Sequence, residues 1–282
     1  MVLREKAVLM SQNWIVNWRA LGISFVLYSI ALFFAAETWV KIINTTAIKV
    51  SFIKHFRYYC FSLLARRLPG TIWYIAYRAE VYNTEGISRK LTSLASGIEY
   101  AVGIVSGVIV SSLFAISILK QYPKGILIIG LLLVLSSLIL HPKVLNWLFK
   151  KLSSEKLNYR YAITLQWIAI HALTRIAGGF LVFFIAQILY PVSSIYLPYF
   201  IGGWALVGTI ANALVFLPTN LGFTEISFSL ILSNIMPASI AAIVAIMTRL
   251  TITLFEVIWA VIILTWDSII KKKINQKELL SD

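Results

Sequence analysis

Long apolar runs separated by short polar stretches dominate the chain, and the lengths of these runs predict membrane-spanning helices. A helix needs about 20 predominantly apolar residues to cross a hydrocarbon core about 30 Å thick. We expect regular spans over Ala20–Ala36, Leu91–Leu119, Ile126–Leu140, Ala162–Leu189 and Tyr199–Phe216, and a last one from Met236 to about Trp266. The pattern therefore predicts an all-α, polytopic membrane helix bundle, with residues 1–282 forming a single transmembrane domain.

The first irregular region, Val50–Tyr82, is too polar for a plain span. It contains the sequence Leu68-Pro69-Gly70, and proline and glycine both break helices. We therefore expect one helix, a break at Pro69-Gly70, and a second, amphipathic helix over Thr71–Tyr82 whose aromatic side chains lie at headgroup depth. Two interpretations of the arginines in this region stay open. Their guanidinium groups bind lipid phosphate, or their charges only orient the chain in the membrane. These arginines are Arg66, Arg67 and Arg78.

The second irregular region starts at Pro218 and ends at Glu225, between two apolar runs. Pro218 ends a helix, and Asn220 and Gly222 tolerate the turn conformations that follow. Glu225 then falls in the first turn of a new helix, where the helix dipole favours negative charge. This new run, Phe223–Ile235, rises only about 20 Å, which is short for a crossing. The pattern favours a broken or re-entrant helix of the kind that forms transporter sites, the alternative being an ordinary loop at the membrane surface.

The composition agrees with a membrane protein, because 60% of the residues are hydrophobic and only 13% are charged, with a mean hydropathy of +0.85. A soluble domain has about 25% charged residues. The formal net charge is +14, which in a soluble protein would indicate a nucleic-acid partner. Here the basic residues lie between apolar runs, where they orient the chain with its basic loops in the cytoplasm. No nucleic-acid partner is therefore expected.

The most basic of these loops, His141–Tyr161, is expected in the cytoplasm. Arg4 near the amino end and Lys271–Lys273 near the carboxyl end place both termini there as well, with residues 267–282 as a short cytoplasmic tail. Both ends on one side require an even number of crossings, and we expect about eight segments in a multi-pass protein of the cell (plasma) membrane. The stretch before Met10 lacks the apolar core of a removable signal peptide, so the first span is expected to act as an uncleaved anchor.

A set of polar residues lies inside the apolar runs, and it consists of Glu99, His171, Arg175, Gln187, Asn212, Glu225, Arg249 and Glu256. A charge at a helix centre costs about 2.5 to 3.5 kcal/mol on insertion, so these side chains should face the bundle interior and find partners. The spacing suggests two pairs on shared helix faces, His171 with Arg175 and Arg249 with Glu256. Gly103 and Gly107 form a GxxxG pair, which favours a close helix contact.

We interpret the polar set as a cavity that accepts an anionic headgroup. Arg175 and Arg249 would be phosphate partners, and Glu99 and Glu225 coupling or gating carboxylates. The expected substrate-binding residues are Arg78, Glu99, His171, Arg175, Pro218, Asn220, Gly222, Glu225 and Arg249. The alternative is a set of internal salt bridges that only fixes helix packing.

The sequence offers little that specifies catalysis. Its three histidines, His55, His141 and His171, are too scattered for a metal site, and Cys60 is the only cysteine, so no metal or cofactor is expected. The chain lacks the H-E-x-x-H, G-x-S-x-G and P-loop motifs. We therefore do not expect an enzyme, and an intramembrane lipid transferase is the weakest alternative.

Two blocks of the sequence carry a family resemblance. One consists of Pro218, Leu221, Gly222 and Glu225, and the other of Arg66-Arg67-Leu68-Pro69-Gly70-Thr71-Ile72-Trp73 followed by Arg78, Glu85-Gly86-Ile87-Ser88 and Glu99. The first resembles the P-G-G-L-G-x-x-E element of the lysylphosphatidylglycerol synthase transmembrane, or flippase-like, family of bacterial and archaeal membrane proteins. The second is similar to the amino-proximal block of that family. Thr219 and Asn220 stand where the family usually has two glycines.

The resemblance implies the membrane part of that family, without its soluble aminoacyltransferase domain. The first hypothesis is therefore a flippase-like protein that translocates a phospholipid or a lipid-linked glycan precursor between leaflets. Its substrate would be an anionic phospholipid or a polyprenyl-phosphate-linked molecule. The second hypothesis is a non-transporting membrane scaffold for a glycosyltransferase or another envelope-lipid enzyme. The candidate partners are membrane lipids, such a glycosyltransferase, and a second copy of the chain in a homodimer.

Overall fold

The computed structural model describes residues 16–45, 50–68, 72–115, 123–152, 160–214 and 222–279, and every regular element in these ranges is a helix. In chain order the helices are α2 (Trp18–Ile43), α3 (Phe52–Ala65), α4 (Trp73–Asn83), α5 (Arg89–Phe114), α7 (Pro123–Ile139), α8 (Pro142–Leu152), α9 (Tyr161–Leu189), the short 3-10 helix η1 (Ser194–Tyr196), α10 (Leu197–Ala213), α11 (Phe223–Leu232) and α12 (Ala238–Leu279). The expected all-α fold class is confirmed.

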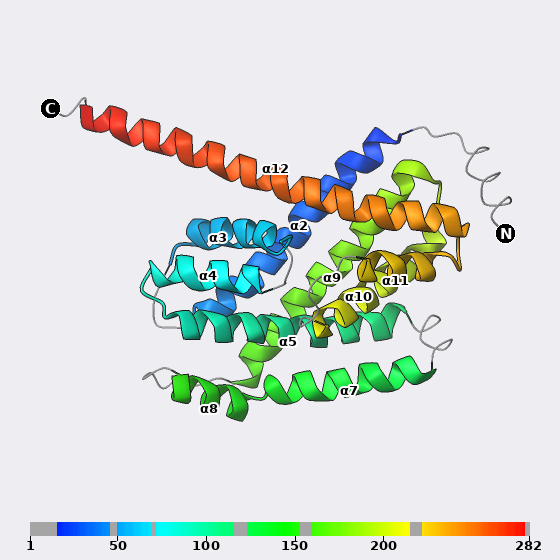
Figure 1. Cartoon of the computed structure of the whole chain (residues 1–282), viewed down its shortest axis with the longest axis horizontal. Coiled ribbons are helices and arrows are strands. Elements are labelled where there is room, and N and C mark those ends of the chain that lie inside the picture. Colours follow the sequence, from blue (N-terminus) through cyan, green and yellow to red (C-terminus); the bar gives the residue numbers. More distant parts are fainter. Residues whose placement is uncertain are drawn as a thin grey trace.

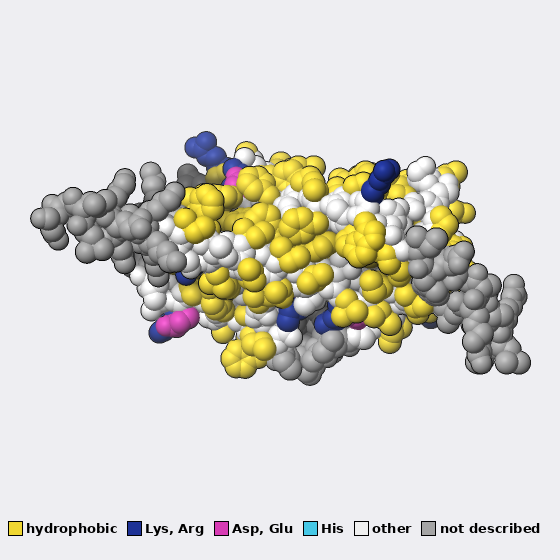
Figure 2. Space-filling view, turned by 90° about the horizontal axis from the view of Figure 1, so that it is seen from above, with side chains coloured by type: hydrophobic (Ala, Val, Ile, Leu, Met, Phe, Trp, Pro, Cys, Tyr) yellow, Lys and Arg dark blue, Asp and Glu magenta, His cyan; other side chains and the backbone are white. Residues whose placement is uncertain are grey.

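Five helical segments are long and apolar enough to cross a membrane, namely α2, α5, α9, η1 with α10, and α12 as far as Ile269. A further candidate is the pair of α7 and α8, which are bent by 55° at the break between them. Large apolar side chains stay exposed on the outer faces, among them Phe33 on α2, Leu131 on α7 and Leu254 on α12. Figure 2 shows hydrophobic side chains spread over one face of the molecule. Hydrocarbon solvates such a surface, so the chain is a multi-pass membrane protein.

The bundle is organised around α2 and α9, which make its most extensive helix contact and run side by side through its centre (Figure 1). α3 and α4 stack beside one half of α5, and α10 packs against α5 and α9. α12 crosses α2 and α3 and continues beyond the bundle, with α11 packed along its first half. α7 and α8 lie along the opposite edge, next to α5. The irregular segments α3, α4 and α11 thus lie among the spans.

The GxxxG pair marks a place where α5 approaches its neighbours closely. A Cβ atom added at Gly107 would overlap Oγ1 of Thr209 on α10. One added at Gly103 would lie 2.9 Å from Nδ2 of Asn212 on α10 and 3.3 Å from Nε2 of His171 on α9. The close helix contact that the glycines predicted is confirmed, and it brings polar side chains of α9 and α10 against the α5 backbone.

The first span is longer than its apolar run. We expected it to end at Ala36, but α2 continues to Ile43. Glu37 and Lys41 form an ion pair of 3.3 Å one turn apart, so each charge has a partner within the helix. Trp39, between them in sequence, is fully buried. The polar residues therefore lengthen the helix instead of ending it.

Two other segments are helical where the apolar pattern predicted no helix. The basic segment after α7 contains α8, whose Leu145 is fully buried against the bundle. α12 continues past Trp266 to Leu279, so the predicted tail begins as an extension of the last span. The Nη1 atom of Arg57 on α3 lies 2.7 Å from Oδ2 of Asp267. This ion pair anchors the start of the extension to the bundle.

Aromatic residues of α4 pack against rings of α2, α3 and α5, and their expected position at headgroup depth stays a prediction. Tyr74 and Tyr82 are buried, and the Tyr82 hydroxyl accepts a hydrogen bond of 2.8 Å from Nε1 of Trp39. Trp73, at the start of α4, stays 50% exposed. The predicted break at Pro69-Gly70 lies outside the described residues, although helices stand on both sides of it.

Candidate functional site

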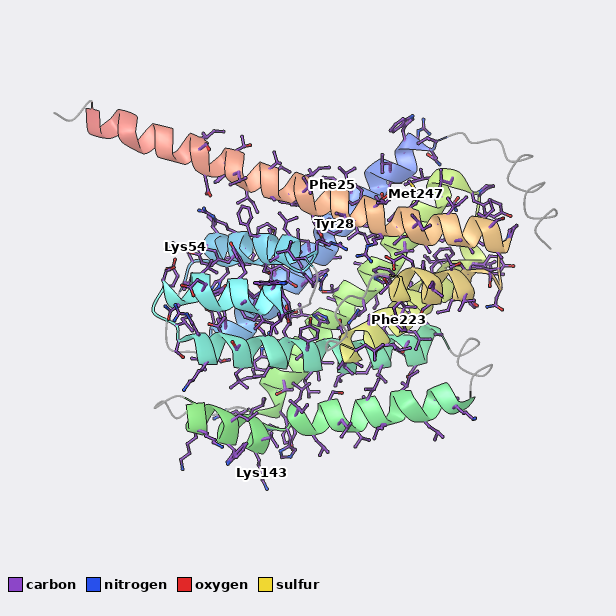
Figure 3. The ribbon with its side chains drawn as sticks, viewed as in Figure 1. Phe25, Tyr28, Lys54, Lys143, Phe223 and Met247 are labelled. Carbon is purple, nitrogen blue, oxygen red and sulfur yellow. The ribbon has the colours of Figure 1, made fainter. Side chains whose placement is uncertain are left out.

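A cavity of about 210 Å³ lies where α2, α3, α4, α5, α9, α10 and α12 converge. Its polar lining consists of Tyr28, Tyr59, Arg66, Tyr74, Arg78, Glu99, Tyr100, His171, Thr174, Arg175, Asn212 and Glu256. Figure 3 shows Tyr28 where α2 passes α12, and its ring centroid lies 5.6 Å from that of Phe255. The bundle interior therefore contains a cavity that part of the predicted polar set lines, together with apolar side chains.

Arg78 is held rigidly in the wall of this cavity. Its Nη1 donates to Oε2 of Glu99 at 2.5 Å, and its Nε donates to Oγ of Ser62 at 2.9 Å. The guanidinium carbon lies 4.1 Å from the ring centroid of Trp39 and 4.6 Å from that of Tyr59. Cation–π contacts contribute about 0.5 to 2 kcal/mol each, more when desolvated. With only 1% of its surface exposed, Arg78 is fully partnered by the protein.

Glu256, the second carboxylate of the cavity, is held by Arg67. The Nε and Nη2 atoms of Arg67 donate to Oε2 and Oε1 of Glu256, both at 2.7 Å. A bidentate pair of this kind fixes the orientation of both groups. The expected pairing of Arg249 with Glu256 is therefore wrong, because their side chains turn to different neighbouring helices although they share one face of α12.

Arg66, next to Arg67 at the end of α3, lines the cavity with an exposed side chain. No carboxylate of the described residues lies within 4.0 Å of its guanidinium nitrogens. Glu256, which also lines the cavity, is already bound by Arg67. Arg66 thus brings a positive charge to the cavity without an ion-pair partner of its own in the described chain.

Arg175 carries the second such charge, from the middle of α9. Its guanidinium fits between two glycines, because Nη2 donates to the backbone oxygen of Gly103 at 3.0 Å and a Cβ atom at Gly208 would overlap Nη1. Its Nε is buried and has no hydrogen-bond partner. Within the described ranges no carboxylate lies within 4.0 Å of it. Since an unpaired charge inside a membrane protein is costly, this guanidinium is suited to bind an anion.

Further polar atoms around Arg175 also lack partners. Nδ1 of His171, Oγ1 of Thr174 and the hydroxyl of Tyr28 are buried, line the cavity, and have no hydrogen-bond partner. Buried polar atoms nearly always have one. Three residues of the cavity lining therefore carry buried polar atoms whose hydrogen-bonding capacity the described protein leaves unused.

The charges of the cavity are unequal. Arg66, Arg78 and Arg175 line it against Glu99 and Glu256, and Arg67 adds a positive charge behind Glu256. Arg78 and Arg67 are matched by the two glutamates, which leaves Arg66 and Arg175. Both of these residues line the same cavity. Two guanidinium groups that line one cavity without ion-pair partners in the described chain favour a phosphate or another oxyanion there.

A second charged cluster joins the start of α11 to α12. Oε2 of Glu225 accepts a hydrogen bond of 2.9 Å from the backbone nitrogen of Gly222, and its Oε1 accepts one from Nη1 of Arg249. Gly222 has a φ of 85°, a backbone conformation that favours glycine. Figure 3 shows Phe223 at the start of this short helix. We refer to Gly222, Glu225 and Arg249 as the α11 clamp.

The structure divides the predicted substrate-binding residues into two groups. Those that line the cavity are Arg78, Glu99, His171 and Arg175. Those that form the α11 clamp, outside the cavity lining, are Gly222, Glu225 and Arg249. Pro218 and Asn220 lie outside the described residues. The polar residue Gln187 belongs to neither group, because its Nε2 donates to the backbone oxygen of Val192 at 2.5 Å and so closes the turn after α9.

The predicted site residues did not include several groups that line the cavity. Asn212 belonged to the intramembrane polar set but had no assigned role, and Arg66 was left between two interpretations. Four tyrosines and Trp204 also line the cavity, and the tyrosines are Tyr28, Tyr59, Tyr74 and Tyr100. They come from four different helices, and aromatic residues are common in membrane helices. Their spacing in the sequence therefore gave no signal that they meet.

Comparisons of the chain with protein-family models, with curated proteins and with solved structures found no match. The similarity to the lysylphosphatidylglycerol synthase membrane region stays a prediction. The candidate site is therefore defined by its own geometry, which is a polar cavity inside a membrane helix bundle with two arginines that lack ion-pair partners in the described chain.

Proposed function

We propose that this membrane protein binds the anionic headgroup of a lipid in the cavity and moves the lipid between leaflets. The observation that carries the proposal is the environment of Arg175. Its guanidinium is partly buried, its Nε lacks a hydrogen-bond partner, and no described carboxylate lies within 4.0 Å. A phosphate group would supply both the missing charge and the missing acceptor.

The size of the cavity suits a headgroup better than a whole lipid. Sites that enclose drug-sized ligands measure about 300 to 1,000 Å³, whereas this cavity measures about 210 Å³. The acyl chains would stay in the membrane, against the exposed apolar faces of the bundle. Arg66, Arg175 and the unpartnered atoms around them would replace the water that hydrates the headgroup in the bulk phase, which lowers the cost of carrying it across hydrocarbon.

The ion pairs support a separation between charges that hold the helices and charges that bind the headgroup. Arg78 with Glu99 and Arg67 with Glu256 hold α4, α5, α3 and α12 around the cavity. Within each pair the arginine and the glutamate neutralise each other, so the excess positive charge of the cavity lies at Arg66 and Arg175. The alternative is that all intramembrane charges only fix helix packing. It explains the two ion pairs. It does not explain Arg175 on α9, which has no ion-pair partner among the described residues.

Binding is tested by the melting temperature of the purified protein in detergent, measured with added phosphatidylglycerol or with diacylglycerol of the same acyl chains. A ligand that binds only the folded state raises the melting temperature with its concentration. We expect phosphatidylglycerol to do this for the wild-type protein and for Arg89→Gln, whose exposed ion pair with Glu80 lies away from the cavity. Arg175→Gln should lose most of the effect. Equal stabilisation of Arg175→Gln and the wild type would contradict the proposed site.

A further inference from the structure

The amphipathic helix α8 leaves the axis of α7 at an angle of 55° and turns one face toward the protein. Leu145 on that face is fully buried. α7 has 17 residues and rises about 25 Å, so it nearly crosses a hydrocarbon core about 30 Å thick without help from α8. α8 is therefore free to take another role.

The opposite face of α8 is basic and exposed. Lys143, Trp147 and Lys151 follow one another at intervals of four residues, and Lys150 lies beside them. All four side chains are exposed, Trp147 to 59%. The Nζ atom of Lys151 lies 5.4 Å from the ring centroid of Trp147. α8 contains no acidic residue, and Figure 3 shows Lys143 pointing away from the bundle.

The bend between the two helices is fixed by His141. Its Nδ1 accepts a hydrogen bond of 3.2 Å from the backbone nitrogen of Lys143. A backbone amide can only donate, so in the neutral ring the proton is on Nε2, which then donates to the hydroxyl of Tyr161 at 2.5 Å. The start of α8 is thus tied to the start of α9, and the direction of α8 is set by the fold.

We infer that α8 lies along the membrane surface and binds anionic lipid headgroups with the face formed by Lys143, Trp147, Lys150 and Lys151. Tryptophan is enriched at the level of the headgroups, and lysines near that level are attracted by anionic lipid. A helix that continued the α7 span would instead place three lysines in hydrocarbon without carboxylate partners on α8. This inference does not use the cavity, so it stands or falls independently of the proposed function.

The test uses the full-length protein in vesicles, with a fluorescent label on a new cysteine at Trp147→Cys. Cys60 is 2% exposed, and the protein without a new cysteine must stay unlabelled. The matched control is Leu131→Cys on the exposed face of α7. Spin-labelled lipids with the quencher at the headgroup or in the middle of the acyl chain are compared. Vesicles contain phosphatidylcholine alone or phosphatidylcholine with phosphatidylglycerol.

We expect the headgroup quencher to act most strongly on the label at position 147, and the acyl-chain quencher on the label at 131. Quenching at 147 should increase with phosphatidylglycerol and decrease with salt, and the combined substitution Lys143→Gln, Lys150→Gln and Lys151→Gln should remove this dependence. Acyl-chain quenching at 147 equal to that at 131 would show that α8 crosses the membrane. Quenching at 147 that is absent, or insensitive to lipid charge, would also overturn the inference.

Discussion

Arg67 and Glu256, 189 residues apart in the sequence, are joined by two hydrogen bonds of 2.7 Å. The pair ties the end of α3 to the middle of α12, and the carboxylate side chain is only 2% exposed. Because Glu256 lines the cavity, the contact also holds one wall of the candidate site in place. Its main role is therefore to position α3, and Arg66 with it.

Breaking this pair should destabilise the protein. Glu256→Leu leaves Arg67 without its partner, and we expect a loss of about 3 kcal/mol, near the lower end of the range for buried pairs since Arg67 is 27% exposed. Chemical unfolding in detergent micelles measures the free energy. The combined Arg67→Leu and Glu256→Leu variant should lose less than the sum of the two single variants. Additive losses would show that the pair does not act as a unit.

Gly208→Ala should reduce lipid binding by displacing Arg175. The added methyl group would occupy the place of Nη1, so the guanidinium must move within the cavity. The matched control is Gly97→Ala on α5, where a Cβ atom meets nothing within 4 Å. That control should be stabilised by up to about 1 kcal/mol, because alanine favours helix over glycine. The measurement is lipid-dependent melting temperature, and unchanged lipid stabilisation of Gly208→Ala would contradict the placement of Arg175.

Gly222→Ala tests the α11 clamp through the backbone alone. Nothing lies within 4 Å of an added Cβ atom, so the effect comes from the φ of 85°. We expect a loss of about 1 to 3 kcal/mol in the free energy of unfolding, the cost of holding a residue with a side chain in a sparsely populated backbone conformation. Gly22→Ala, also with open space around the Cβ atom, is the control. A Gly222→Ala variant as stable as that control would show that the glycine is not required.

Glu85, in the turn after α4, should make the stability of the protein depend on pH. Hydrogen bonds from the Tyr58 hydroxyl and then from Lys54 hold the pKa of the Glu85 carboxyl below its usual value. A carboxyl with a lowered pKa stabilises the fold above its unfolded pKa of about 4.3 and loses this contribution as the pH falls through the folded pKa.

The comparison of Glu85→Gln with the wild type isolates this effect. The difference in melting temperature between the two proteins should be constant above about pH 5 and should shrink as the pH falls below about 4.3. A difference that grows toward low pH would contradict the claim that the ionised Glu85 carboxylate stabilises the fold.

The sequence predicted the spans because each depends on one long, largely apolar run. It also predicted that His171 and Arg175, four apart in the sequence, share one face of their helix, and both line the cavity. The ends of the helices were less predictable. The Glu37 and Lys41 pair continues α2 beyond its apolar run, and the lysines of α8 made that helix look like a loop.

The partners of the buried charges were not predictable from spacing. Glu99 meets Arg78, Glu256 meets Arg67, and Glu225 meets Arg249 across different helices. These contacts depend on how helices cross, which in turn depends on small residues such as Gly103 and Gly208. A single sequence gives the positions of such residues but not the helix that approaches each one.

Transbilayer movement of a fluorescent phosphatidylglycerol in proteoliposomes tests the proposed function most directly. Wild type, Arg175→Gln and Arg89→Gln are compared at equal amounts of reconstituted protein. Rapid movement is expected for wild type and Arg89→Gln. Arg175→Gln should be slower by about tenfold or more, since a hydrogen bond to a charged group contributes about 1.5 to 3 kcal/mol. An equal rate for Arg175→Gln, or no movement by the wild-type protein, would contradict the proposed function, and the second result would favour a scaffold for a partner enzyme.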